Sequence, residues 1–520
     1  MAQRARAVWP YPALLPYSVK VYPIVQVSDE IGPQRPGSWP PAMDPRVAAW
    51  AERVDRSPSH NQLYLHVPFC PFLCHFCPLY KHPATGDRNK ELKAQFVEAL
   101  KREIAMAAPA CKDTLFQSVY FGGGTPTELT ADELGDLLAT LRSNFCVTAD
   151  AEITLEGVAK QMLSEGYIET CIRHGFNRFS FGVQTTDLAL RKRIGRGDNV
   201  NDYPALISLI RKLAPAASVN VDFMAGLPEQ TFESIETDID VIRKWGVNSV
   251  DVLYYVMLPG TRLRKLVQLG TRPSPDSGER LLEIRELVNR SLAKRDFVQR
   301  TGEVFVRDDE NRFVQASYGG GVSCVNTVLG LGPSAFGIVN GFVYQNVCDL
   351  DLYIKQINER LIPVHRGRQL TVPLARRRAV IFSIMRLNIH EALVDDSSYR
   401  SVLNNWQRKG LIHRSGQSYV LSDLGRLWYN HMQIDCLPFT DVLSTLRMFG
   451  SIEEQNQMLK KSQSELSQFE REVLTLIGGR RLKTIRHWGY RTFLAIHRAA
   501  GLDGRAIGFT GAIESGDARH

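Results

Sequence analysis

The chain has 520 residues, of which 44% are hydrophobic and 23% are charged, and this composition is typical of globular proteins and excludes a disordered chain. The formal net charge of +8 is a modest surplus for this length, so it indicates a mildly basic surface and no nucleic-acid partner. No apolar run approaches the ~18 residues of a membrane span, and prolines interrupt the N-terminal segment where a signal peptide would be apolar. We therefore expect a cytoplasmic protein of roughly two to four domains, in a compartment that keeps thiols reduced.

The first segment in chain order, residues 1–61, is rich in proline and has little periodicity, so we predict an arm that wraps the next domain. Between residues 62 and 300, short apolar runs alternate with amphipathic ones, which predicts an α/β fold of parallel strands joined by helices. Six such units make an incomplete (β/α)6 TIM-like barrel, about three quarters of a full one, with functional loops at the carboxyl ends of its strands. The predicted strands are Leu63–Val67, Ser118–Phe121, Glu152–Leu155, Arg178–Phe181, Val219–Met224 and Ser249–Tyr255, and the predicted helices are Lys90–Ala107, Ala131–Arg142, Val158–His174, Tyr203–Leu213 and Phe232–Trp245.

Three further segments follow the barrel. Residues 301–370 have a mixed pattern, and the glycines between Thr327 and Gly337 indicate tight backbone turns. Residues 371–436 carry two helical patterns and a hairpin, which predicts a small winged-helix-like domain that caps the barrel. The helices are Val372–Leu387 and Tyr399–Lys409, the hairpin is Ile412–Leu421 with Gly416 at its turn, and residues 437–520 form a helical tail with an amphipathic run at Ile452–Ile477 and a basic cluster of Arg480, Arg481, Lys483 and Arg486.

The most informative stretch for chemistry is Cys70-Pro-Phe-Leu-Cys74-His-Phe-Cys77, which comes just after the first predicted strand. Three thiolates from one loop can hold three irons of a [4Fe–4S] cluster and leave the fourth iron without a protein ligand. An iron with an open position can bind a reactant, whereas a fully ligated cluster mainly transfers electrons. The spacing therefore favours a catalyst over an electron carrier.

Two other uses of these thiols stay open on spacing alone. A structural zinc site would take its fourth ligand from His66, His75 or His82. The second alternative is a disulfide between two of these cysteines, with the third thiol left free. The remaining cysteines of the chain are scattered and do not form the disulfide framework of a secreted protein. We interpret those six as buried apolar side chains: Cys111, Cys146, Cys171, Cys324, Cys348 and Cys436.

Glycines and polar residues follow the strands where the carboxyl ends of parallel strands meet. The second strand ends in Gly122-Gly-Gly-Thr-Pro126, and residues without a Cβ let a backbone approach a ligand closely. Glu156 ends the third strand, where a carboxylate can accept hydrogen bonds from two ribose hydroxyls. Gln184 points out of the fourth strand end, and Arg196, twelve residues later, can pair with a substrate carboxylate.

The fifth and sixth strands end in different chemistry. Asp222 lies near the end of the fifth strand, in the run Asn220-Val-Asp-Phe-Met-Ala-Gly-Leu-Pro228. The run from Leu253 to Gly260 closes the sixth strand with apolar groups that suit the stacking of an adenine or the lining of a radical pocket. The predicted strand ends thus combine carboxylates, a guanidinium, an amide and an apolar surface.

These motifs in this order resemble those of the radical S-adenosylmethionine (SAM) superfamily: Cys-x3-Cys-x2-Cys, Gly-Gly-Gly-Thr-Pro, Gly-Val-Gln and Gly-Leu-Pro. Within the superfamily they resemble the HemN-like branch, typified by oxygen-independent coproporphyrinogen oxidase, over residues 64 to 421. The resemblance implies a [4Fe–4S] cluster on Cys70, Cys74 and Cys77 and one or two bound SAM molecules. The positions that match contacts to the first SAM are Tyr64, Gly123, Thr125, Glu156, Gln184, Arg196 and Asp222, and those near a second are Gly124, Met224, Leu253 and Val256.

The resemblance implies an enzyme that cleaves SAM reductively to a 5′-deoxyadenosyl radical, which abstracts a hydrogen atom from its substrate. We expect class C transfer of a methyl or methylene group to an sp2 carbon of an aromatic or heterocyclic substrate, because Pro78-Leu79 replaces the Gly-Cys of the coproporphyrinogen enzymes. The alternatives are coproporphyrinogen oxidase-like chemistry on a porphyrin or haem, and a haem-binding chaperone. The expected partners are a small aromatic, heterocyclic or tetrapyrrole substrate and a reducing protein such as flavodoxin or ferredoxin, with no membrane and no nucleic acid.

Overall fold

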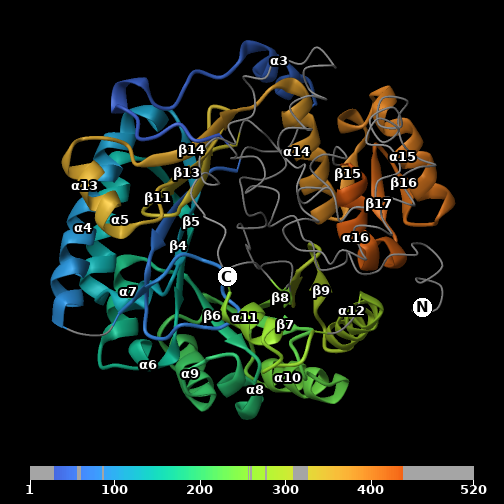
Figure 1. The fold of residues 1–520 in the computed structure, drawn as a ribbon, viewed down its shortest axis with the longest axis horizontal. Coiled ribbons are helices and arrows are strands. Elements are labelled where there is room, and N and C mark those ends of the chain that lie inside the picture. Colours follow the sequence, from blue (N-terminus) through green and yellow to red (C-terminus); the bar gives the residue numbers. More distant parts are fainter. Residues whose placement is uncertain are drawn as a thin grey trace, which may run out of the picture.

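The computed structural model describes residues 29–54, 60–84, 87–255, 257, 261–275, 278–307 and 326–436. In this part of the chain the strands form a twelve-stranded sheet in the order β14-β13-β12-β11-β1-β4-β5-β6-β7-β8-β10-β9, together with a three-stranded and a two-stranded sheet. Figure 1 shows the large sheet curved into an open arc, with helices on its outside. None of the helices in these ranges has the length and hydropathy of a membrane span.

The six predicted strands are all present, and they lie side by side in chain order. Each pairs in parallel with the next, from β1 to β8. This arrangement confirms the predicted α/β fold and the incomplete parallel barrel. The strands are β1 (Gln62–Val67), β4 (Leu115–Gly123), β5 (Cys146–Gly157), β6 (Arg178–Gln184), β7 (Ser218–Ala225) and β8 (Ser249–Tyr254).

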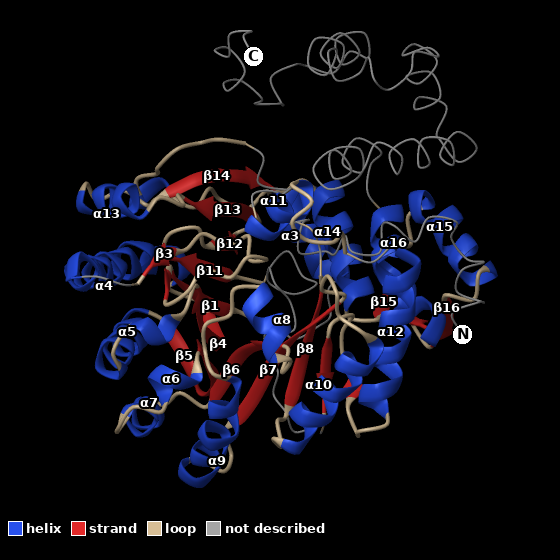
Figure 2. Cartoon of the chain, turned by 60° about the horizontal axis from the view of Figure 1, so that its bottom comes forward, coloured by secondary structure: helices blue, strands red, loops and turns tan. Residues whose placement is uncertain are grey.

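Helices connect these strands and cover one face of the sheet (Figure 2). The predicted helix Val158–His174 is wrong in one respect, because two short helices separated by Gly166 replace it. Gly166 has a φ of +70°, a left-handed conformation that does not continue an α-helix. The helices of the barrel are α4 (Asp87–Ala107), α5 (Ala131–Asn144), α6 (Ala159–Met162), α7 (Tyr167–His174), α8 (Leu188–Arg193), α9 (Tyr203–Leu213), α10 (Phe232–Lys244), α11 (Arg262–Gln268) and α12 (Gly278–Ala293).

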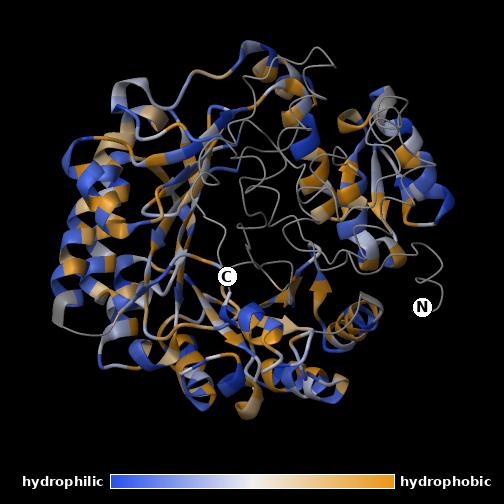
Figure 3. Ribbon diagram, in the orientation of Figure 1, coloured by the Kyte–Doolittle hydropathy of each residue, from blue (hydrophilic) through white to orange (hydrophobic). Residues whose placement is uncertain are grey.

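Alternate residues of the parallel strands face opposite sides of the sheet, and the two sides differ in chemistry. Phe181 of β6 contacts the ring of Tyr203 on α9, so the odd-numbered residues of β6 face the helices. The register pairs Tyr64 with Tyr120, Thr154 and Arg178 across four strands on the other face. The apolar face makes the core with the helices, whose surfaces mix hydrophobic and hydrophilic segments (Figure 3), and the polar face lines the inside of the arc.

Strands from residues 298–369 extend the sheet at both edges, which the mixed pattern of this region did not predict. At one edge β10 (Val304–Val306) pairs antiparallel with β8, and β9 (Val298–Gln299) pairs with β10. At the other edge β11 (Val328–Leu331) pairs in parallel with β1. Antiparallel β12 (Phe336–Val339), β13 (Phe342–Asn346) and β14 (Val364–Gln369) follow, with α13 (Leu350–Asn358) between the last two.

The expected tight turns of this region are present. A Cβ on Gly330 would lie 2.2 Å from the carbonyl oxygen of Phe336, so β11 and β12 approach too closely for a side chain. The N–H of Gly330 also donates to the hydroxyl of Tyr344, which donates back to the carbonyl of Gly330. Glycine at this position therefore permits the close pairing of β11 and β12.

The proline-rich segment contains a helix that the sequence analysis missed. Helix α3 (Pro45–Val54) buries Val47, Trp50, Ala51 and Val54, which recur at helical spacing. Glu30 and Gln34 form isolated bridges to Arg366 and Ile362, so this short stretch lies along β14 and the residues just before it, whereas α3 contacts α14 (Val372–Met385). Residues 1–28 of the predicted arm lie outside the described residues.

The C-terminal elements occur where the sequence predicted two helices and a hairpin, with a third strand and a third helix in addition. Gly416, with a φ of +57°, lies in the hairpin turn as expected. Figure 1 shows these elements in orange beside α12, and the guanidinium of Arg285 on α12 lies 4.5 Å from the ring of Tyr254 and 4.9 Å from that of Tyr429. The elements are α14 (Val372–Met385), β15 (Asn388–His390), α15 (Ser397–Arg408), β16 (Ile412–Ser415), β17 (Ser418–Leu421) and α16 (Asp423–Asp435). The predicted domain boundaries and the capping role stay predictions, and the tail 437–520 lies outside the described residues.

A buried carboxylate joins α4 to the added strands. Glu103 is 1% exposed and accepts hydrogen bonds from the N–H of Gly332 (2.7 Å), Nδ2 of Asn346 (2.8 Å) and the hydroxyl of Tyr353 (2.6 Å). Burial raises the pKa of Glu103 to about 7, although the three donors act in the opposite direction. The folded protein therefore binds a proton at Glu103 in a pH range where the unfolded chain has lost it.

We expect this proton to make stability depend on pH. Because the folded pKa of Glu103 lies above the unfolded value, its contribution is largest at low pH and declines as pH rises through 7. Between pH 5 and 8 the advantage of the wild type over Glu103→Gln in free energy of unfolding should shrink by up to about 3 kcal/mol, as measured by urea denaturation. Glu98→Gln, on an exposed part of the same helix, should leave the pH dependence unchanged, and equal dependence in wild type and Glu103→Gln would contradict the assignment.

Candidate functional site

The loop that carries the three cysteines follows β1 and is held on one side by the end of β4. The N–H of Gly124 donates to the carbonyl of Val67 (2.8 Å), and that of Thr125 donates to the carbonyl of Phe69 (2.7 Å). The hydroxyl of Thr125 also donates to Sγ of Cys70, at 3.8 Å. The start of the loop is thereby fixed at the carboxyl ends of two neighbouring parallel strands, where the fold predicts function.

Helices α8 and α11 hold the other side of the loop. The N–H of His75 donates to the carbonyl of Ile194 (2.8 Å), and its own carbonyl accepts from the N–H of Leu263 (2.8 Å). Nδ1 of His75 lies 3.0 Å from the carbonyl of Arg193. A Cβ on Gly195 would lie 2.8 Å from the ring of His75, so this glycine lets the segment after α8 approach the loop.

The three cysteines are free and partly exposed, and their charges would interact. Burial above all, and the neighbouring Cys77 and Cys74 thiolates to a smaller extent, raise the pKa of Cys70 to about 12. Burial also raises the pKa of Cys74. Thiols in such surroundings ionise readily only when a metal supplies positive charge, so this donor set fits a cationic metal group.

The geometry also bears on the zinc alternative. Within the described part of the chain, no three His, Cys, Asp or Glu side chains are arranged to hold a single metal ion. A cubane cluster does not need that arrangement, because each thiolate binds a different iron. The histidines that could complete a zinc site all have a ring nitrogen near another group: His66 near the hydroxyl of Tyr64 (2.9 Å), His75 near the carbonyl of Arg193 (3.0 Å) and His82 near Oδ1 of Asn89 (3.1 Å).

The glycines at the end of β4 have a different immediate role from the one expected. A Cβ on Gly124 would lie 2.6 Å from the carbonyl oxygen of Phe69 and 2.7 Å from that of Val67. Gly123 has a φ of +104°, and its Cβ would lie 2.6 Å from Nδ1 of His66. The absent side chains thus make room for the cysteine loop and for β1, which places the end of β4 beside the thiols.

Glu156 lies at the end of β5, next to this glycine run. It accepts a short hydrogen bond from the hydroxyl of Tyr120 and a longer one, 3.3 Å, from the N–H of Gly123. A Cβ on Gly122 would lie 2.9 Å from Oε2 of Glu156. Burial raises the pKa of Glu156 to about 7, so its charge changes near neutral pH.

Gln184 is held in an unusual backbone conformation at the end of β6. Its φ is +68°, and the pairing of β6 with β7 shifts register between Gly182 and Gln184. Its side chain is buried, and Oε1 has no hydrogen-bond partner among the described residues. A strained backbone and an unsatisfied buried acceptor are both typical of a ligand site.

Arg196 lies beside the cysteine loop, as its expected role requires. Its Nη1 donates to Sγ of Cys74 at 3.8 Å, and its guanidinium carbon lies 4.6 Å from the centre of the Phe72 ring. Its Nε lies 2.9 Å from Oδ1 of Asp198. The cation therefore sits next to the second thiol of the motif.

Two more expected contacts lie on the polar face of the sheet. The hydroxyl of Tyr64 lies 2.9 Å from Nδ1 of His66, and its ring is 6.2 Å from that of Tyr120. Asp222 accepts a hydrogen bond from Nδ2 of Asn220 at 3.0 Å. Both side chains therefore belong to networks that hold them in place.

The residues expected near a second SAM are only partly together. Met224 and Leu253 are register partners on β7 and β8, and both belong to a small apolar cluster that includes Phe76 of the cysteine loop. Gly124 is at the contact between β4 and the loop, three strands away from β7. Val256 lies outside the described residues.

Four residues of this region were given no role at the SAM site from the sequence, although His66 was named as a possible zinc ligand. His66 and Asn220 occupy the polar face of β1 and β7, so the alternation along those strands was a usable signal. Arg191 and Asp198 lie on either side of Arg196 in a charged run, and such a run by itself predicts a solvent-exposed surface. The structure buries both of these side chains, which are 3% and 2% exposed.

The interpretation of the other cysteines is partly wrong. Cys111, Cys171 and Cys436 are buried as expected, whereas Cys146 is exposed and Cys348 is partly exposed. Cys146 begins β5, beyond the part of that strand that the helices cover. Cys324 lies outside the described residues.

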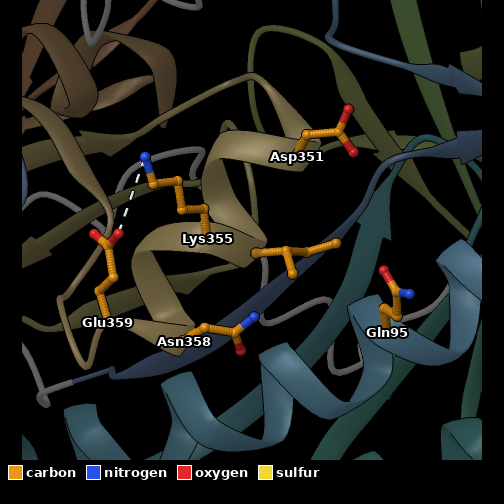
Figure 4. Close-up of a pocket in the computed structure, with 6 residues that line it drawn as sticks. Gln95, Asp351, Lys355, Asn358 and Glu359 are labelled. Carbon is orange, nitrogen blue, oxygen red and sulfur yellow. Dashed lines mark ion pairs between the residues drawn. The ribbon is translucent and has the colours of Figure 1, made fainter.

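A surface pocket between α4 and α13 is separate from this site. Its lining mixes charged and amide side chains with one isoleucine, and Lys355 forms an ion pair with Glu359 at 4.0 Å (Figure 4). It contains none of the predicted site residues, and its outer position on the two helices keeps it away from the strand ends. The residues are Gln95, Asp351, Ile354, Lys355, Asn358 and Glu359.

Comparison with known proteins identifies the family of the chain. The model of the radical SAM superfamily matches residues 64–242. Anaerobilin synthase of Escherichia coli O157:H7 is 28% identical over 76% of this chain and 88% of its own length. Oxygen-independent coproporphyrinogen III oxidase of Salmonella typhimurium is 30% identical over 70% of this chain and 80% of its own. The structure of coproporphyrinogen III oxidase (HemN) from Escherichia coli superposes with a TM-score of 0.63 at 26% identity, covering 75% of this chain and 92% of that one.

The chain therefore belongs to the radical SAM superfamily, in its HemN-like branch, and is an enzyme that uses a [4Fe–4S] cluster and SAM.

Proposed function

We propose that this enzyme carries out SAM-dependent radical chemistry on a tetrapyrrole. The observation that carries the proposal is the contact of the cysteine loop with the end of β4, beside which β5 and β6 lie in parallel, with Glu156 and Gln184 on the same edge of the sheet. The two relatives are named for coproporphyrinogen III and for a bilin, both of which are tetrapyrroles.

Cys70, Cys74 and Cys77 are the residues we assign to the cluster. When bound, the cluster and SAM together supply a 5′-deoxyadenosyl radical that abstracts a hydrogen atom. The chain holds the loop rigidly through backbone hydrogen bonds on both sides, which keeps the thiols at constant spacing. A one-electron carrier such as flavodoxin or ferredoxin is the reductant we expect.

The polar face of the sheet suits the polar parts of SAM. Glu156 would accept from the ribose hydroxyls, and Arg196 would pair with the carboxylate of the methionine part. Gln184 offers an unsatisfied acceptor, and Thr125, Gly123, Tyr64 and Asp222 complete the assigned contacts. In this assignment the chain orients the cofactor through fixed, buried groups, which limits side reactions of a radical.

Class C methyl transfer, with a second SAM as the methyl donor, is the second candidate. It is favoured by the apolar cluster of Phe76, Met224 and Leu253, which joins the cysteine loop to the ends of β7 and β8. It is also favoured by Pro78-Leu79, where Leu79 is 48% exposed beside the loop in place of the Gly-Cys of the coproporphyrinogen enzymes. Met224, Leu253, Val256 and Gly124 are the residues assigned to the second SAM.

The cysteine assignment predicts the behaviour of a single variant. Cys74→Ala removes one of three thiolates, so the anaerobically reconstituted protein should lose the visible absorbance of the cluster and should no longer cleave SAM. Iron content and 5′-deoxyadenosine measure the two effects. Cys146→Ser, at the exposed start of β5, is the matched control and should retain both. SAM cleavage by Cys74→Ala at the wild-type rate would refute the assignment.

The carboxylate of Glu156 should make SAM affinity depend on pH. Because its raised pKa is about 7, the side chain becomes protonated as pH falls from 8 to 6 and loses acceptor capacity for the ribose hydroxyls. We expect the dissociation constant of SAM to rise about tenfold over this range, as measured by equilibrium binding. Glu156→Gln should bind weakly throughout without that rise, and any titration of SAM itself would appear equally in both proteins. A rise of equal size in the variant would contradict this role.

One assay separates the two candidate functions. The reconstituted enzyme, a chemical reductant and SAM with a deuterated methyl group are incubated with haem, with coproporphyrinogen III or without substrate. A tetrapyrrole substrate should increase 5′-deoxyadenosine several-fold above the substrate-free rate. Deuterium in 5′-deoxyadenosine would identify the SAM methyl group as the hydrogen source and support methyl transfer, and unlabelled 5′-deoxyadenosine would support abstraction from the tetrapyrrole. No stimulation by either tetrapyrrole would sink the substrate proposal.

A further inference from the structure

A buried charged cluster after β6 supports the site, although it belongs to none of the recognised motifs. Its centre is Asp198, whose Oδ1 lies 2.8 Å from Nη2 of Arg191 and 2.9 Å from Nε of Arg196. The hydroxyl of Tyr203 donates to Oδ2 of Asp198 at 2.5 Å. The four side chains are at most 7% exposed, so one carboxylate pairs with two guanidinium groups away from water and leaves the cluster with a surplus of positive charge.

One arm of this cluster reaches the strained end of β6. Nη1 of Arg191 donates to the carbonyl of Val183 at 2.5 Å and to that of Thr185 at 3.0 Å. These carbonyls lie on either side of Gln184, the residue with a φ of +68°. Arg191 thus holds the turn that aims the Gln184 side chain, and Asp198 holds Arg191.

The other arm reaches the cysteine loop. Arg196 lies between Asp198 and Sγ of Cys74 and stacks on Phe72, which fixes the plane of its guanidinium. Its Nη2 is buried and has no hydrogen-bond partner in the described part of the chain. The two arms therefore end in an unsatisfied donor, Nη2 of Arg196, and an unsatisfied acceptor, Oε1 of Gln184, and buried groups of this kind point to a polar ligand.

We propose that Asp198 is a positioning residue for SAM binding, because it holds Arg196 beside Cys74 and, through Arg191, holds Gln184. It touches neither the cluster nor SAM in this assignment and acts only through the two arginines. The proposal rests on the proposed function for the identity of the ligand. The arrangement also gives Cys74 a neighbouring positive charge, which favours the reduced, more negative state of a cluster bound there.

A double-mutant cycle tests the proposal. Asp198→Asn keeps the size of the side chain but removes its charge, so Arg196 and Gln184 lose their common support, and SAM should bind about tenfold more weakly. Arg196→Gln should also weaken binding, and in that background Asp198→Asn should weaken it further by a smaller factor, about twofold, because only its support of Gln184 through Arg191 remains to be lost. Equal weakening by Asp198→Asn in both backgrounds, or no weakening at all, would overturn the proposal.

Two further variants guard against trivial explanations. Tyr203→Phe keeps the ring and the charge balance but removes the hydrogen bond to Asp198, so it should weaken SAM binding in the same direction by a smaller factor. Arg193→Gln, on the same segment but paired at the surface with Glu229, should leave affinity unchanged. Iron content and thermal midpoint are recorded for every variant, and weakening that follows loss of iron or of folding would count against positioning.

The reduction potential of the cluster gives an independent readout. Arg196→Gln removes the positive charge near Cys74, so the potential should become more negative, by about 59 mV for a tenfold change in a one-electron equilibrium. A shift toward positive values would contradict the placement of Arg196. Neither SAM affinity nor the reduction potential of the cluster is measured with a tetrapyrrole present, so these results stand even if the substrate proposal is wrong. A wild-type protein that assembles no cluster would instead refute the cysteine assignment.

Discussion

The parallel register between β1 and β4 is the constraint on which the site depends. It pairs Val67 with Gly123, so the two strands end at the same level and the cysteine loop emerges beside the glycine run. At this contact the carbonyl oxygens of Val67 and Phe69 occupy the space that a Cβ on Gly124 would require, and the N–H of Gly124 donates to the carbonyl of Val67. A larger residue at Gly124 would separate the loop from β4 and would move the thiols relative to every other strand end.

The same register gives the sheet two chemically different faces. Alternate residues of the parallel strands form a core with the helices, and the residues between them carry hydroxyls, amides and carboxylates across neighbouring strands. Asn220 illustrates how such groups are satisfied, because it bonds to Ser180 and Ser249 on the two adjacent strands and to Asp222 on its own strand. Gln184 and Arg196 are exceptions near the strand ends, because among the described residues each has a buried polar atom without a hydrogen-bond partner. The exceptions therefore mark the site more clearly than the network does.

Two buried carboxylates, Glu156 at the cofactor site and Asp198 in the cluster that supports it, have opposite pKa shifts. Glu156 has a raised pKa because it is buried, while Asp198 has a lowered pKa, because the adjacent Arg196 and Arg191 outweigh the effect of its burial. The first carboxylate is therefore poised to change charge near neutral pH, and the second remains ionised. A residue that contacts a ligand and a residue that holds other side chains can be distinguished by these opposite environments.

Local sequence determined the parallel strands, most of the helices, the cysteine motif and the strand-end residues, because each depends on spacing within a short window. The predicted helix Val158–His174 failed at Gly166, and α3 was missed because prolines around it hid a regular pattern of buried residues. Only the tertiary structure decided that β11, far along the chain, pairs in parallel with β1, and that Asp198 lies buried between two arginines. Those contacts depend on which distant segments share an edge or a cavity, and the free energy of burying a charge is set by partners that no local window contains.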